Sequence, residues 1–158
     1  MGLGANRRLD SPASATAAAT IDPSRGSNPG APMHAPENLE IEEGIARFRP
    51  RGRSSLVEAV DRISGAIAFC REARVARLLV DASGFVGVSI PTLVDRFLMI
   101  EEWALESNGI VAVALVVHPE YIHERKFGVK VAADFGLVAD VHTGEREALA
   151  WLSGVRDR

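Results

Sequence analysis

The chain contains almost no cysteine. Cys70 is the single cysteine among its 158 residues, so the sequence offers neither an internal disulfide nor a zinc site built from cysteine ligands. Chains without disulfides are typical of reducing compartments. We therefore expect a cytoplasmic protein.

Long apolar runs and blocks of like charge are also missing. No apolar run approaches the ~18–20 residues that span a bilayer, so we expect no membrane-spanning segment. The formal net charge is −3, with acidic and basic residues interspersed, whereas nucleic-acid binders are normally basic. The sequence thus predicts no nucleic-acid partner.

Familiar catalytic and cofactor-binding motifs are absent as well. There is no Gly-x-Gly-x-x-Gly or Walker loop for a nucleotide, and no Gly-x-Ser-x-Gly for a serine nucleophile. One group of metal-ligand residue types exists, but its spacing matches no zinc motif: His118, Glu120, His123, Glu124 and His142. We predict a protein that is not an enzyme and that uses no metal and no cofactor.

Residues 1–37 differ in composition from the rest of the chain. They are rich in Pro, Ala, Ser and Gly and have almost no large apolar side chain. Such a segment cannot bury enough apolar surface to offset the conformational entropy lost on folding. We predict a disordered leader over residues 1–37 and one folded domain over residues 38–158.

Apolar periodicity divides that domain into elements. Two alternating runs, 39–42 and 45–49, flank Glu43-Gly44 and predict a hairpin. Apolar residues at helical spacing predict a helix from Ser54 or Ser55 to about residue 74, and the continuous apolar run 76–81 predicts a strand buried on both faces.

The second half of the domain continues the alternation of strands and helices. Its predicted elements are a helix that begins near Pro91 with Ser89 as candidate cap, a strand over 110–117, a helix from Pro119 to about Phe135, a strand over 137–142, and a helix capped by Thr143. The order β-β-α-β-α-β-α-β-α predicts an α/β fold with a single mixed, mostly parallel sheet.

The strand over 76–81 ends in a polar turn, Asp81-Ala82-Ser83-Gly84. Sites of open α/β sheets lie at the carboxyl ends of the strands, so Asp81 and Ser83 are candidates for a contact surface or pocket rim. The alternative, which we favour, is turn chemistry: Asp81 and Ser83 bond nearby backbone amides and Gly84 takes a positive φ.

The residues that follow form an unusually apolar loop, with Phe85, Val88 and Ile90 around Ser89. Such a loop either packs on the core or binds a ligand or partner. His118, Tyr121 and Phe127 lie on the segment after the next strand, and a half-apolar helix there suits a site for a small lipid-like ligand. An ordinary amphipathic helix packed on the sheet is the favoured alternative.

Several short segments together resemble the SpoIIAA-like group of the STAS/SEC14-type fold. They are residues 47–52 (Arg-Phe-Arg-Pro-Arg-Gly), 78–81 (Leu-Leu-Val-Asp), 114–120 (Ala-Leu-Val-Val-His-Pro-Glu), 127–132 (Phe-Gly-Val-Lys-Val-Ala) and 148–152 (Ala-Leu-Ala-Trp-Leu). The resemblance covers residues 39–152. It implies helices packed mainly on one side of a mixed sheet, and a non-catalytic module.

Relatives in that group carry Asp-Ser-Ser-Gly, whose serine is phosphorylated at the start of a helix. This chain has Val88-Ser89-Ile90-Pro91 there instead, so we do not expect that switch. The resemblance implies action by contact with an unknown protein partner, with a homodimer as one arrangement. The alternative is a carrier or sensor of a small hydrophobic ligand held between residues 85–90 and 121–131.

Overall fold

The computed structural model describes residues 34–156. The predicted leader over residues 1–37 therefore lies almost entirely outside the described residues. The folded unit begins at His34.

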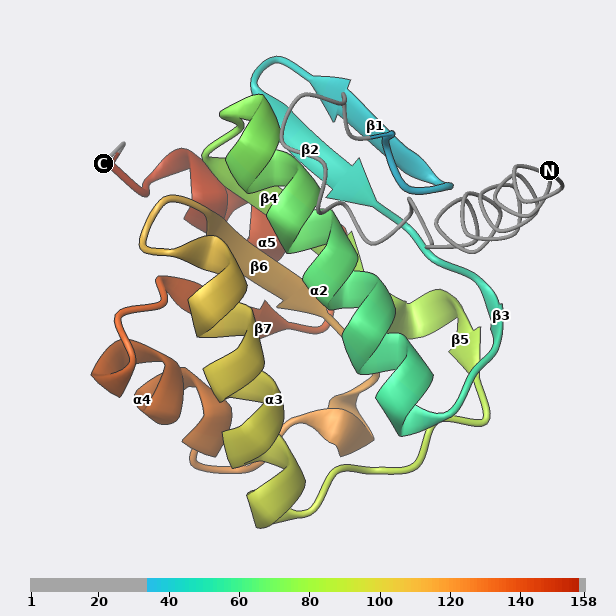
Figure 1. Ribbon diagram of the computed structural model, residues 1–158. Coiled ribbons are helices and arrows are strands. Elements are labelled where there is room, and N and C mark those ends of the chain that lie inside the picture. Colours follow the sequence, from blue (N-terminus) through green and yellow to red (C-terminus); the bar gives the residue numbers. More distant parts are fainter. Residues whose placement is uncertain (1–33, 157–158) are drawn as a thin grey trace, which may run out of the picture. The chain divides into compact units, whose positions relative to one another are not determined.

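A five-stranded mixed sheet forms the centre of this unit (Figure 1). Its strands, in spatial order, are β1 (Leu39–Glu42), β2 (Ile45–Phe48), β4 (Arg77–Asp81), β6 (Ala112–Val116) and β7 (Ala139–His142). β1 pairs antiparallel with β2, and every other neighbouring pair is parallel. The predicted α/β class with one mixed, mostly parallel sheet is confirmed.

The hairpin between β1 and β2 turns at Glu43 and Gly44, as predicted. Both residues have positive φ, 52° and 79°, which is the backbone twist that joins two antiparallel strands through a two-residue turn. The turn sets Leu39 opposite Phe48 and Glu42 opposite Ile45. Phe48 is thereby fixed on the buried face of the sheet.

Helices cover the two faces of the sheet unequally. In the described part of the chain they are α2 (Leu56–Ala73), α3 (Leu93–Ser107), α4 (Phe127–Asp134) and α5 (Glu145–Ser153). In Figure 1, α2, α3 and α4 lie on one face and α5 on the other. Side chains of β4 alternate accordingly: Leu78 and Val80 join the larger core, and Leu79 joins the smaller core beneath α5.

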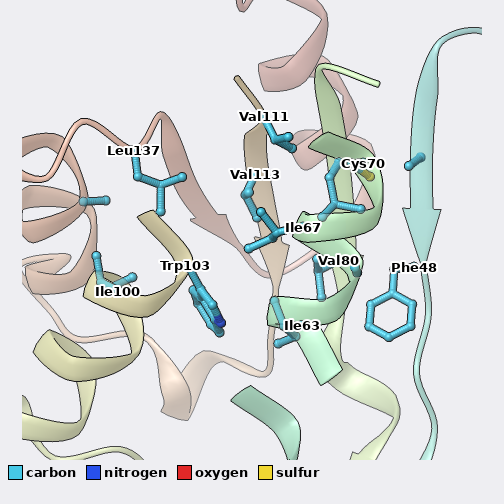
Figure 2. Close-up of a cluster of buried hydrophobic side chains, with 14 of the residues drawn as sticks. Phe48, Ile63, Ile67, Cys70, Val80, Ile100, Trp103, Val111, Val113 and Leu137 are labelled. Carbon is cyan, nitrogen blue, oxygen red and sulfur yellow. The ribbon is translucent and has the colours of Figure 1, made fainter. Parts of the chain in front are cut away.

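The larger core is a continuous apolar cluster between the sheet and the first three of these helices (Figure 2). Ile63, Ile67 and Cys70 of α2 reach it at helical spacing, and Trp103 of α3 is buried against them. Burial raises the pKa of the Cys70 thiol to about 12, because the thiolate would lose its water there. Cys70 is thus a packing residue and not a nucleophile.

Helix starts follow capping chemistry, with a correction to the prediction for α3. Ser55 caps α2 in a reciprocal box with Glu58, as one of the two predicted caps. α3, however, is capped by Thr92 together with Asp95, so Ser89 as its cap was wrong. The Thr-x-x-Asp pair satisfies two backbone amides, which a single serine before the proline would not.

The predicted start of α5 was also wrong. Its cap is Gly144, which makes no side-chain cap bond, and not Thr143. The strand before it, β7, extends to His142, which leaves only a two-residue connection.

The predicted continuous helix from Pro119 to Phe135 was wrong. Pro119 opens only a short 3-10 turn, η3 (Pro119–Tyr121), and α4 begins at Phe127. Between them the chain leaves helical geometry, and Lys126 has the left-handed φ of 49°. Tyr121 and Phe127 therefore lie on different elements.

A short second sheet, absent from the prediction, joins β3 (Gly52–Arg53) to β5 (Phe85–Val86). It ties the loop after β4 to the loop before α2. Gly84, which precedes β5, does not adopt a positive φ, so that expectation was wrong. The glycine is needed because a Cβ there would lie 2.7 Å from the carbonyl oxygen of Pro50.

Candidate functional site

A cavity of about 130 Å³ lies under α2 and α3, beside the carboxyl ends of β6 and β7. It is partly open to solvent. Its floor is the sheet, with Val113 and Leu115 from β6 and Val141 from β7. A cavity of ~150 Å³ lined by aliphatic and aromatic side chains is large enough for benzene, so this one can hold a small apolar group.

The helices supply apolar walls for the cavity. Val60 and Ile63 come from α2, and Ile100 and Trp103 from α3. Figure 2 shows Ile63, Ile100 and Trp103 gathered on the same side of the sheet as Val113. The indole nitrogen of Trp103 donates to the carbonyl of Val60 at 3.2 Å, which satisfies the one polar atom of the ring.

Two loop segments from distant parts of the sequence close the cavity. Phe85 and Val88 come from the loop after β4, and Tyr121 comes from η3. The hydroxyl of Tyr121 donates to the backbone carbonyl of Val88, so the two segments are joined directly. These are the segments between which the sequence suggested a small hydrophobic ligand.

The charged lining of the cavity is mostly basic. His118, His123, Lys126 and Arg96 line it, against one carboxylate, Asp140. Lys126 forms an ion pair with Asp140, with 2.9 Å between Nζ and Oδ1. Asp140 therefore balances the charge of Lys126. Arg96, the other permanent cation of the lining, makes different contacts.

Arg96 sits half-buried in the first turns of α3. Its Nη1 donates to the backbone carbonyl of Tyr121 at 3.0 Å. Desolvation lowers the pKa of Arg96, with the neighbouring Asp95 acting in the opposite direction. Asp95 itself accepts from the backbone amide of Thr92 in the helix cap.

Asp81 and Ser83 lie outside the cavity lining and form a turn. Oδ1 of Asp81 accepts from both the backbone amide and the hydroxyl of Ser83, at 3.1 Å and 2.5 Å. This is the turn chemistry that was favoured for these two residues from the sequence. Because the Ser83 hydroxyl donates to a carboxylate, it is not held by an imidazole for nucleophilic attack.

A second polar group occupies the face of the sheet that carries α5. Arg49 donates from Nε and Nη2 to both carboxylate oxygens of Glu145, at 2.8 Å and 2.9 Å. That bond holds the pKa of Glu145 down to about 2 and raises the pKa of Arg49. The pair fixes the start of α5 to the end of β2, which is a structural task.

The nine residues proposed from the sequence divide between the cavity and other places. Phe85, Val88, His118 and Tyr121 line it. The others do not: Asp81 and Ser83 form the turn, Ser89 and Ile90 are exposed, and Phe127 packs against the larger core.

Arg96 and Trp103 are the lining residues that sequence reasoning missed. Leu93 and Phe97 of α3 fall at helical spacing with the buried Ile100, yet they are 50% and 43% exposed. The inward face instead carries Arg96, Ile100 and Trp103, spaced by four and three. A single arginine in phase with buried apolar residues was the signal that could have found it.

Comparisons of the chain with protein-family models, with curated proteins and with solved structures found no match. Within residues 34–156, no three His, Cys, Asp or Glu side chains are grouped so that they could hold a metal ion. None of the helices in the described part of the chain is long and apolar enough to cross a membrane.

Proposed function

We propose that this protein is a non-catalytic module that binds a small apolar ligand in the cavity beneath α2 and α3. The observation that carries the proposal is the cavity itself, a space of about 130 Å³ whose walls are mostly apolar, with a few charged and polar side chains. Sites for small molecules are concave and mostly apolar, with a small number of polar groups, and this cavity has that character. The function of carrier or sensor is the alternative raised by the sequence.

The resemblance of residues 39–152 to the SpoIIAA-like group supports this proposal. We propose that the chain has the STAS-type topology of that group and acts by binding, without the Asp-Ser-Ser-Gly phosphorylation switch. The sheet order β1-β2-β4-β6-β7, with α5 packed on the second face, supports that assignment.

Filling the cavity tests the proposal. Val60 lines the cavity, whereas Val57, on the same helix, is 70% exposed. We expect calorimetric titration with 1-octanol to give saturable binding to the wild-type protein. Val60→Phe should remove that binding because the ring occupies the space, while the matched control Val57→Phe should leave the affinity unchanged. Equal affinities of the two variants, or no binding to the wild type, would count against a cavity ligand.

A second candidate function, protein contact, is favoured by the exposed face of α3. Five large apolar side chains on this helix are exposed: Leu93, Val94, Phe97, Leu98 and Leu105. Monomeric proteins rarely expose apolar patches of this kind without using them. We propose a second copy of this chain as the occupant of the patch.

Sedimentation velocity tests the homodimer directly. We expect concentration-dependent dimers for the wild-type protein and monomers for Leu98→Glu, because a buried charge at the contact is costly. A monomer at every concentration would rule out a second copy on this face. Neither result affects the titration with 1-octanol.

A further inference from the structure

The cavity wall carries a guanidinium group, that of Arg96, which forms no ion pair within residues 34–156. Among these residues, no carboxylate forms an ion pair with Arg96, whose one hydrogen bond, from Nη1, goes to the backbone carbonyl of Tyr121. That bond leaves the donors on Nε and Nη2 available. The group is half-buried beside apolar side chains.

Such a placement is costly unless something compensates for it. Removing a charge from water is unfavourable unless it gains a partner and hydrogen bonds, and the lowered pKa of Arg96 reflects that loss of water. The neighbouring cation in the lining, Lys126, has its partner in Asp140. Arg96 is the permanent cation of the lining whose charge remains unbalanced within the described residues.

We propose that the cavity ligand is a small organic monoanion, with its carboxylate on the guanidinium of Arg96 and its apolar body in the cavity. This inference rests on the proposed function, since it needs an occupied cavity. It specifies the chemical class of the occupant: an aliphatic or aromatic carboxylate with a body of about six to eight carbons, judged against a benzene-sized cavity.

The charge count favours a carboxylate over a phosphate. One guanidinium neutralises one negative charge, and Asp140 already neutralises Lys126. Counted over these permanent charges, a dianionic phosphate would leave one negative charge unbalanced in a mostly apolar site. The planar fork of arginine also matches the two oxygens of a carboxylate, which a lysine would not.

The recognition of charge can be measured separately from the recognition of the apolar body. Octanoate, 1-octanol and octylammonium have the same chain and differ in head-group charge. We expect octanoate to bind the wild-type protein about tenfold or more tightly than 1-octanol, since hydrogen bonds to a charged group contribute more than neutral ones. Octylammonium should bind most weakly, because it meets a like charge.

Substitution of the arginine should remove only that discrimination. Arg96→Met keeps the apolar stem of the side chain and removes the charge, so we expect octanoate to lose its advantage over 1-octanol in this variant. An unchanged circular dichroism spectrum shows that the variant is folded. Arg125→Met is the matched control, because Arg125 is an exposed cation nearby that does not line the cavity; it should keep the wild-type preference.

The outcomes separate this inference from the function on which it rests. If 1-octanol binds the wild-type protein as tightly as octanoate, the proposal of an anionic ligand is wrong, and the proposal of an apolar ligand in the cavity is retained. A preference for octanoate that survives Arg96→Met, or that Arg125→Met removes, places the head group elsewhere and overturns the role of Arg96. If none of the three compounds binds, both proposals fail.

Discussion

Gly84 shows how a single residue fixes the approach to the cavity. The backbone of Pro50 passes so close that a Cβ would lie 2.7 Å from its carbonyl oxygen and 3.3 Å from Cγ of Arg51. That contact holds the loop leading to Phe85, which lines the cavity. Glycine is therefore required at this position because the backbone of Pro50 leaves no room for a Cβ.

Replacing that glycine should be destabilising. We expect Gly84→Ala to lower the free energy of unfolding by about 1–3 kcal/mol, because backbone must move to accommodate the methyl group. The control is Gly65→Ala in α2, where no atom lies within 4 Å of the added Cβ and alanine favours the helix by up to ~1 kcal/mol. Urea denaturation of both variants measures the two free energies of unfolding. Equal changes in the two variants would contradict the close contact at Gly84.

The Arg49–Glu145 pair makes a prediction about pH. The pKa of Glu145 falls from 4.5 to about 2 in the folded protein, so its carboxylate stabilises the fold fully above pH 4.5 and loses that contribution as the pH falls toward 2. The pair is partly exposed, which limits its contribution to about 1 kcal/mol.

We therefore expect Glu145→Gln to be about 1 kcal/mol less stable than the wild type at pH 7, with the difference shrinking from pH 4.5 to about pH 2. Denaturation curves over that range give the measurement. Glu147→Gln, in the same first turn of α5 but without an ion pair among the described residues, is the control. A stability difference between Glu145→Gln and the wild type that does not change with pH would contradict the lowered pKa of Glu145.

Residues of the site could be predicted individually where the sequence around them has a recognisable local pattern. Phe85 and Val88 stood out as apolar residues in a loop, and Tyr121 followed a strand end; all three line the cavity. Arg96 was missed because the phase of its helix depends on which side chains meet α2 and the sheet, and that packing is not local. The turn at Asp81 was correctly anticipated because it is made by neighbouring residues.

At the scale of elements, α3 differs from its prediction in the residue that caps it. The capping box at Thr92 and Asp95 starts the helix after the proline. Along this helix Phe97 is exposed and Arg96 lines the cavity. The cap sets where the helix begins, and the packing of α3 against α2 and the sheet sets which of its residues face the cavity.

The two hydroxyls before α3 give a test of that cap. Thr92→Ala should lower the free energy of unfolding by about 1 kcal/mol, because the amide of Asp95 loses its acceptor. Ser89→Ala should have almost no effect, since Ser89 is exposed and does not cap the helix. Thermal unfolding of the two variants distinguishes them, and a larger loss for Ser89→Ala would restore the cap predicted from the sequence.

The split between η3 and α4 could not be predicted from periodicity. Apolar spacing continues through residues 119–135, and the break depends on Lys126, a residue type that rarely adopts its left-handed φ of 49°. The ion pair between Lys126 and Asp140 of β7 accompanies that geometry. A tertiary contact thus accompanies the end of one element and the start of the next.

At the scale of the whole molecule, the sheet and its helices were predictable and the cavity was not. The alternation of strands and helices in the sequence predicts a mostly parallel sheet with right-handed crossovers. The cavity is an unfilled space bounded by side chains from α2, α3, β6, β7 and two loops. Its volume depends on how those elements pack together, and no local pattern encodes that.

The central proposal is tested most directly by an NMR titration that shows which apolar side chains of the protein contact an apolar ligand. We would titrate toluene into protein with labelled Ile, Leu and Val methyl groups and follow their NMR shifts. The account predicts saturable shifts at Ile63, Ile100 and Leu115, which line the cavity, with Leu98 and Leu105 on the exposed face of α3 unchanged. Shifts confined to Leu98 and Leu105, or none at saturating toluene, would contradict it.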